Sequence, residues 1–184
     1  MSLIPKTLNM ALQHHQAGRL PEAEALYRQI LQAQADHPDA LHLLGVIAHQ
    51  GGKHDVAVEY ITRAIALNPT VAEYHSNIGE ACRALGRLNE AETSLRQALA
   101  LKPASAEAMN NLGAVLQAQG KLEEAVAQYR QALALKPGYA QAHNNLGSAL
   151  LAQEKVEEAA THFRQALALN PSYAGAHNNL GIVL

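Results

Sequence analysis

The sequence predicts an all-α solenoid, a stack of antiparallel helix pairs. The first observation is an internal repeat, because segment 106–139 aligns with 72–105 and with 140–173 when it is shifted by 34 residues. A period in this range marks a solenoid whose copies bury their apolar faces against one another. The second observation is that 48% of the residues are hydrophobic but only 4% are aromatic. Alanine and leucine therefore supply most of the apolar surface, which favours close-packed helices over strands.

The repeat boundaries follow from a recurring Leu-Gly-type pair at positions 7 and 8 of each copy. A leader at 1–3 precedes five full copies, and a sixth copy is incomplete. The copies occupy 4–37, 38–71, 72–105, 106–139, 140–173 and 174–184. We expect the sixth copy to form only a first helix, and its apolar stripe lacks the second helix that covers this stripe in the other copies.

Each copy is expected to contain two helices joined by a short turn. In copy 106–139, apolar residues at helical spacing predict a first helix over about Ala106–Gln119 and a second over about Leu122–Leu135. Gly120 lies in the turn between them, and Pro137 ends the second helix.

Two columns of residues predict how the helices of a pair pack. Mid-helix glycine costs about 1 kcal/mol relative to alanine, so a recurring one needs a reason, such as close helix approach. Position 8 carries Ala11, Gly45, Gly79, Gly113, Gly147 and Gly181. Position 24 carries large residues instead, namely Tyr27, Ile61, Leu95, Tyr129 and Phe163. We therefore expect large side chains of the second helix to pack against the small position of the first.

These columns resemble the tetratricopeptide repeat (TPR) family. Copy 140–173 has the family's residues at the family's spacing: His143, Leu146, Gly147, Ala159, Phe163, Ala166 and Pro171. The resemblance implies a right-handed superhelix whose concave surface is lined by the first helices. Three features depart from the family pattern. Position 4 lacks tryptophan, Ala35 stands where proline is expected, and Glu154 replaces a turn glycine, which is expected to strain that turn.

A narrower resemblance concerns the residue pattern of the repeats. The pattern A-x-A-x-x-N-L-G, followed by Q-G-K-L-E-E-A and a Y-R-x-A-L run, is similar to the repeats that precede the catalytic domain of O-linked N-acetylglucosamine transferases. In that family the position-6 asparagines line the substrate channel. The resemblance implies an alternative function, as the substrate-recognition N-terminal part of a larger protein O-glycosyltransferase.

Asparagine recurs on the free face of the first helices, and these residues are the candidate peptide-binding residues. Position 6 carries Asn9, Asn77, Asn111, Asn145 and Asn179, and position 5 carries Asn110, Asn144 and Asn178. Asparagine is a poor helix-interior residue, so its recurrence indicates a role. One interpretation is a ladder of amides that binds the main chain of an extended peptide, which needs both donors and acceptors. The other is that these amides tie neighbouring helices together, and the sequence leaves both open.

Composition excludes several partners. The net charge is −2, so no basic excess exists for nucleic acid or an anionic membrane, and no apolar run approaches the length of a membrane span. The only cysteine, Cys82, excludes an intrachain disulfide, fits a reducing compartment and predicts a cytoplasmic protein. Because Cys82 falls on a core position, we expect it to be a small buried residue rather than a nucleophile. The free face also lacks the lysine of a carboxylate-clamp TPR, so recognition of an acidic chaperone tail is not expected.

No motif indicates catalysis, a cofactor or a metal site. The chain has no GxSxG, HExxH or CxxC motif and no phosphate-binding loop. His75, His143 and His177 share position 4, but successive copies are expected roughly 16–20 Å apart at about 8–10 Å per helix contact. One metal ion needs its ligands within about 2.0–2.3 Å, so core-edge histidines are the better interpretation. The sequence thus predicts a non-enzymatic scaffold that binds an extended protein or peptide on its concave face. A further alternative is a scaffold that self-associates through its incomplete C-terminal repeat.

Overall fold

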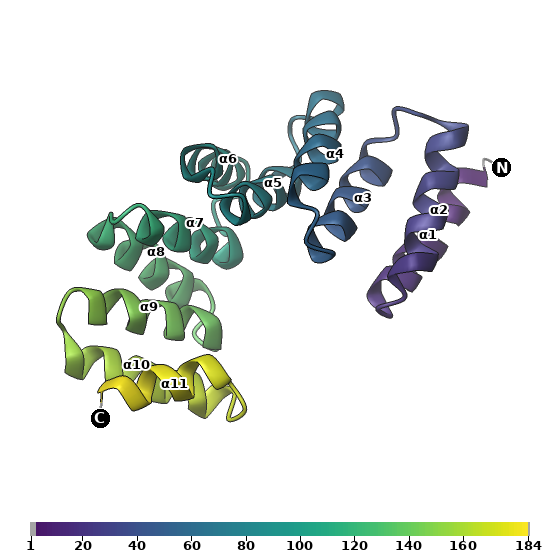
Figure 1. Ribbon diagram of the computed structural model, residues 1–184. Helices are drawn as coiled ribbons and strands as arrows, with labels where there is room; N and C mark the ends of the chain where they lie inside the picture. Colours follow the sequence, from purple (N-terminus) through teal and green to yellow (C-terminus); the bar gives the residue numbers. More distant parts are fainter. Residues whose placement is uncertain (1–2, 184) are drawn as a thin grey trace. The chain divides into compact units, whose positions relative to one another are not determined.

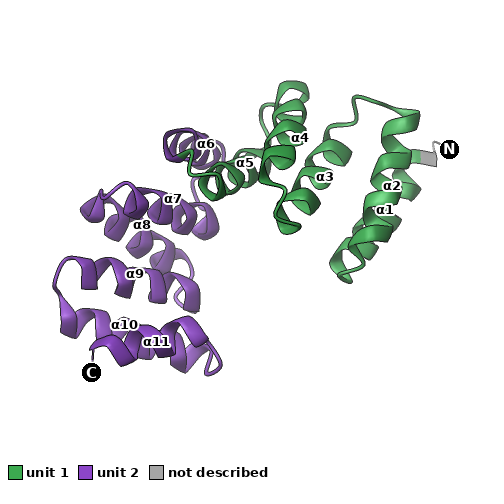
Figure 2. Ribbon diagram, in the orientation of Figure 1, with its two compact units in different colours: residues 1–87 green, residues 88–184 purple. Residues whose placement is uncertain are grey.

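The computed structural model describes residues 3–183 and forms eleven α-helices and no strand within that range. The chain divides into two compact units, residues 1–87 and 88–184, which Figure 2 shows in different colours. The expected leader at 1–3 lies outside the described residues except for Leu3, where the first helix begins. The predicted all-α fold of antiparallel helix pairs is confirmed.

The two units contain consecutive helices of similar length (Figure 1). Unit 1 contains α1 (Leu3–Gln16), α2 (Leu20–Ala33), α3 (Pro38–Gln50), α4 (His54–Leu67) and α5 (Ala72–Ala84). Unit 2 contains α6 (Leu88–Leu101), α7 (Ala106–Ala118), α8 (Leu122–Leu135), α9 (Ala140–Ala152), α10 (Val156–Leu169) and α11 (Ala174–Val183). In each unit, helices that follow one another in the chain pack side by side, and α9 also contacts both α7 and α11.

The turn between the helices of a pair has a fixed backbone geometry. After α7, the amide of Gly120 donates to the carbonyl of Gln117 at 3.0 Å, and the amide of Lys121 donates to the carbonyl of Leu116 at 2.9 Å. This pair of bonds is a Schellman motif, which needs a left-handed residue at its centre, and Gly120 has φ of 78°. Glu154 occupies the same place after α9 with φ of 63°, so the strain expected at this turn is confirmed.

Close approach within a helix pair is confirmed at the position-8 residues Gly45, Gly113 and Gly147. A Cβ atom added to Gly113 would lie 2.6 Å from Cε1 of Tyr129, and one added to Gly147 would lie 2.6 Å from Cε1 of Phe163. Tyr129 and Phe163 are 1% and 0% exposed. The large residue of the second helix therefore occupies the space that a side chain would need on the first. Cys82 is 2% exposed, as its core position predicted.

The second helix ends at the same register whether or not a proline follows. Helix α8 ends at Leu135, two residues before Pro137, and α2 ends at the equivalent Ala33 although Ala35 stands in the place of the proline. In α2 the amide of Gln34 donates to the carbonyl of Ile30, as the last bond of that helix. Packing against the neighbouring helix therefore sets this end together with the local sequence.

Candidate partner-binding surface

In unit 2 the first helices α7, α9 and α11 carry two predicted asparagines each, and we call the surface that they form the asparagine face; its residues are Asn110, Asn111, Asn144, Asn145, Asn178 and Asn179. In unit 2, Nδ2 of Asn145 on α9 donates to Oδ1 of Asn110 on α7 at 3.0 Å. One repeat further, Nδ2 of Asn179 on α11 donates to Oδ1 of Asn144 on α9, also at 3.0 Å. A position-6 amide therefore binds the position-5 carbonyl of the preceding repeat.

Unit 1 makes the same contact with a different acceptor. Nδ2 of Asn77 on α5 donates to Nε2 of His42 on α3 at 2.7 Å, and His42 occupies position 5 of its repeat. His42 is 8% exposed, and this burial lowers the pKa of its imidazole to about 4, against the opposing charges of Asp39 and Glu73. The neutral ring therefore accepts a hydrogen bond at neutral pH as the carbonyls of Asn110 and Asn144 do.

Burial differs between the bonded asparagines of the two columns. Asn110 and Asn144 at position 5 are 1% and 8% exposed, whereas Asn77, Asn145 and Asn179 at position 6 are half-buried. Asn111 is 9% exposed, and its Oδ1 accepts from Nδ2 of Asn110 at 3.4 Å. The two end members, Asn9 and Asn178, are exposed. At position 5, Asn110 and Asn144 therefore supply buried acceptors. At position 6, Asn145 and Asn179 present amides that are oriented and still reach the surface.

The tie between neighbouring helices thus exists, as one of the two interpretations predicted. It does not use the full capacity of each amide, because an asparagine side chain has two N–H donors and one carbonyl acceptor. The bond to Asn110 uses one donor of Asn145. Asn179 uses Nδ2 for Asn144 and also for Oγ of Ser148 at 3.2 Å, which leaves its carbonyl oxygen outside these bonds.

The position-4 histidines make a contact that the sequence analysis missed. Nε2 of His75 lies 2.9 Å from the carbonyl oxygen of Pro69, and the equivalent distances are 3.0 Å for His143 and 2.8 Å for His177. An N–H group at Nε2 donates to this carbonyl, which lies in the loop that follows the second helix of the preceding repeat. The recurring spacing of six residues between proline and histidine was the available signal.

The expected distance between successive copies was too large. Because Asn145 on α9 bonds directly to Asn110 on α7, the first helices of consecutive repeats are neighbours rather than two helix layers apart. Helices in contact lie about 8–10 Å apart. Among the described residues, no three histidine, cysteine or acidic side chains gather in the arrangement of a metal site.

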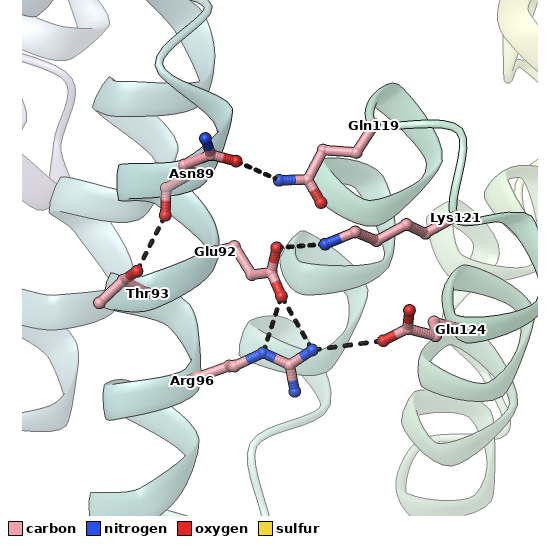
Figure 3. A network of polar contacts seen from close by, with 7 residues as sticks. All are labelled: Asn89, Glu92, Thr93, Arg96, Gln119, Lys121 and Glu124. Carbon is pink, nitrogen blue, oxygen red and sulfur yellow. Dashed lines mark hydrogen bonds and ion pairs between the residues drawn. The ribbon is translucent and has the colours of Figure 1, made fainter.

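A polar network on the second helices was also not predicted (Figure 3). Its members are Asn89, Glu92, Thr93, Arg96, Gln119, Lys121 and Glu124. Glu92 accepts from Nζ of Lys121 at 2.8 Å and from Nε of Arg96 at 2.9 Å, and Arg96 also reaches Glu124 at 3.3 Å. The hydrogen bond from Lys121, followed by that from Arg96, outweighs burial and lowers the pKa of the Glu92 carboxyl to about 2. The network joins α6 to the start of α8.

The fold defines a helical-repeat scaffold of the kind found in protein-interaction domains. No helix in the described part of the chain has the length and apolar character needed to cross a membrane. Over residues 4–183 the sequence matches the family described as the Cilia and flagella-associated protein 70 C-terminal domain. The chain therefore belongs to this family of tetratricopeptide repeats.

Individual proteins agree with this assignment. Tetratricopeptide repeat protein 8 of Caenorhabditis elegans is 27% identical over 86 residues, which are 47% of this chain and only 17% of that protein. The crystal structure of MamA has a TM-score of 0.75 and 25% identity, and the match covers 95% of this chain and 98% of that chain. YrrB, described as a TPR protein with an unusual peptide-binding site, has a TM-score of 0.73 and 22% identity, covering 94% of this chain and 89% of that chain.

Proposed function

We propose that this protein is a scaffold that binds an extended segment of a protein or peptide through the asparagine face. The observation that carries the proposal is that one column supplies buried acceptors and the other supplies partly exposed amides. Buried acceptors at Asn110 and Asn144 hold the amides of Asn145 and Asn179 in fixed orientations, and these amides remain partly exposed. Side chains that are already ordered lose less entropy when a partner binds. YrrB, a TPR protein described as having an unusual peptide-binding site, supports the same use of this fold.

The spacing of the amides fits an extended main chain. Neighbouring first helices lie about 8–10 Å apart, and an extended strand advances about 3.3 Å per residue. The distance between the asparagines of two successive repeats therefore corresponds to about three peptide residues. Amides that contact only the main chain would accept many sequences, provided that the segment is extended and free of N-substitution at the contacted residues.

A peptide selected from a random library of 12-residue sequences tests this proposal. Its affinity is measured by fluorescence polarisation for the parent chain, for Asn145→Ala, and for Gln131→Ala as a control at an exposed position of α8. We expect Asn145→Ala to weaken binding at least about fivefold, the loss of one hydrogen bond of about 1 kcal/mol, and Gln131→Ala to leave it unchanged. N-methylation of the peptide at successive residues should reduce affinity with a period of about three residues.

Two results would contradict the proposal. One is an unchanged affinity of Asn145→Ala together with a clearly lower unfolding temperature, which would assign the amide to packing alone. The other is a loss of binding after side-chain substitution of the peptide with no effect of N-methylation, which would mean that the main chain is not what the face recognises.

Self-association through α11 is a second candidate function. Ile182 on this helix is 66% exposed, and no atom lies within 4 Å of the place where Gly181 would carry a Cβ atom. Burial of apolar area contributes about 25 cal/mol per Å². Sedimentation at rising concentration should show association that Ile182→Asn removes and that Leu135→Asn, a matched change at an exposed leucine of α8, leaves intact. A monomer at millimolar concentration would refute this candidate.

Two interpretations of the sequence stay predictions. One is a role as the substrate-recognition part of a larger protein O-glycosyltransferase, which rests on the residue pattern of the repeats. The other is a cytoplasmic location, which rests on the single cysteine.

A further inference from the structure

The turn between α3 and α4 brings two imidazole rings together. His49 lies in the last turn of α3 and His54 is the first residue of α4, and their Nδ1 atoms are 3.0 Å apart. The backbone fixes this arrangement, because Gly52 has φ of 75° and its amide donates to the carbonyl of His49 at 3.0 Å. The amide of Lys53 donates to the carbonyl of Ala48 at 2.8 Å, which completes the turn.

A second histidine pair in the chain approaches differently and serves as an internal reference. The Nδ1 atoms of His143 and His162 are 3.1 Å apart, and their ring centres are 5.4 Å apart. The nitrogens of His49 and His54 have nearly the same separation, yet their ring centres are only 4.7 Å apart. His143 and His162 therefore face each other end-on, as a hydrogen bond between ring nitrogens requires. The ring planes of His49 and His54 are inclined by 54°, against 28° for His143 and His162, so their Nδ1 atoms lie further from the line that joins the ring centres.

We propose that His49 and His54 form a two-imidazole binding site for a divalent transition metal of the copper and nickel class. Two nitrogens at their separation, each about 2.0–2.1 Å from one ion, subtend an angle of roughly 90–95° at that ion. This angle matches cis ligands of a square-planar or tetragonal ion and is smaller than the tetrahedral angle that Zn²⁺ prefers. Imidazole is a good ligand for both copper and nickel, and copper forms the more stable complexes.

The rings of His49 and His54 are both half-buried and therefore reachable from solvent. Because no third histidine, cysteine or acidic ligand completes a cluster within residues 3–183, water would occupy the remaining positions of the ion.

The test is a titration of the full chain, free of any affinity tag and treated with a chelator, with CuSO₄ and NiSO₄ at neutral pH. Binding is measured by calorimetry and by competition with a chromophoric chelator for the parent, His49→Ala and His54→Ala. The matched controls are His143→Ala and His162→Ala, which remove the end-on pair. Circular dichroism establishes that each variant is folded, and His54→Gln serves as a second variant because it keeps a polar side chain at the start of α4.

We expect the tightest Cu²⁺ site to have a stoichiometry of one and to weaken at least about tenfold when either His49 or His54 is replaced. Electron paramagnetic resonance of that site should show coupling to two nitrogens in the parent and in both control variants. Ni²⁺ should occupy the same site with lower affinity. The proposal is overturned if His49→Ala and His54→Ala bind Cu²⁺ within about twofold of the parent, or if His162→Ala weakens the tightest site equally.

Discussion

We predict that Gly113→Ala destabilises the chain although alanine is the better helix former. The added Cβ atom would lie 2.6, 2.8 and 3.0 Å from three ring carbons of Tyr129. This ring is 1% exposed, and its hydroxyl donates to Oε1 of Gln117 at 3.0 Å, so it has no open space to enter. Overpacking of this kind typically costs about 1–3 kcal/mol, and the gain in helix propensity offsets about 1 kcal/mol. The net loss should be about 1 kcal/mol.

The first repeat limits the size of this effect. Ala11 already lies at the equivalent position opposite Tyr27, and both are 0% exposed. A helix pair can therefore accept alanine against tyrosine after a small separation, which is why we expect a loss of about 1 kcal/mol rather than unfolding. Gly113→Leu adds three more carbons at the same place and should cost more than about 3 kcal/mol.

Thermal and urea unfolding followed by circular dichroism measure the effect, and 1 kcal/mol corresponds to about 2–4 °C for a chain of this size. Tyr129→Leu reproduces the residue of the neighbouring repeat, Leu95, and should suppress the cost of Gly113→Ala in a double-mutant cycle. Gly181→Ala is the matched control, because no atom lies within 4 Å of its Cβ position, and it should be neutral or stabilising. Equal effects of Gly113→Ala and Gly181→Ala would refute the inferred close approach of α7 and α8.

Four other substitutions test single positions. Glu154→Gly should stabilise the chain by about 1 kcal/mol because it relieves a left-handed residue, and Gly120→Glu should destabilise it similarly in chemical denaturation. Glu92→Gln should lower stability by about 1 kcal/mol at neutral pH, after allowance for the solvent around its half-exposed partners. Since the pKa of Glu92 is lowered from 4.5 to about 2, the parent's advantage should be complete above pH 4.5 and disappear as the pH falls toward 2. His42→Asn should keep an acceptor for Asn77. Because the pKa of His42 is lowered from 6.5 to about 4, the parent should lose up to about 3 kcal/mol of stability as the pH falls from 6.5 to about 4. His42→Asn should not show this loss.

The sequence by itself determined the helical repeat and the packing within each pair. The predicted bounds Leu122–Leu135 are those of α8. Helix α7 ends at Ala118, one residue before the predicted end at Gln119, and Gln119 is its C-cap. The opposition of Gly113 and Tyr129 could also be predicted, because the two columns recur in almost every copy. These features depend on residues within one repeat, and the same residue pattern recurs in five similar copies, so each copy supports the prediction independently.

Only the tertiary structure decided which amide contacts which. The sequence placed Asn110 and Asn145 in adjacent columns, but it could not reveal that one is a buried acceptor and the other a half-exposed donor 35 residues away. It did not indicate that His42 replaces an asparagine in this role. Nor did it indicate that Glu92 accepts hydrogen bonds from both Arg96 and Lys121. Such contacts depend on the rotation and spacing of helices from different repeats, and a shift of about 1 Å would exchange one hydrogen-bond partner for another. A 34-residue period states which residues are equivalent, whereas the stacking of the repeats determines which atoms meet.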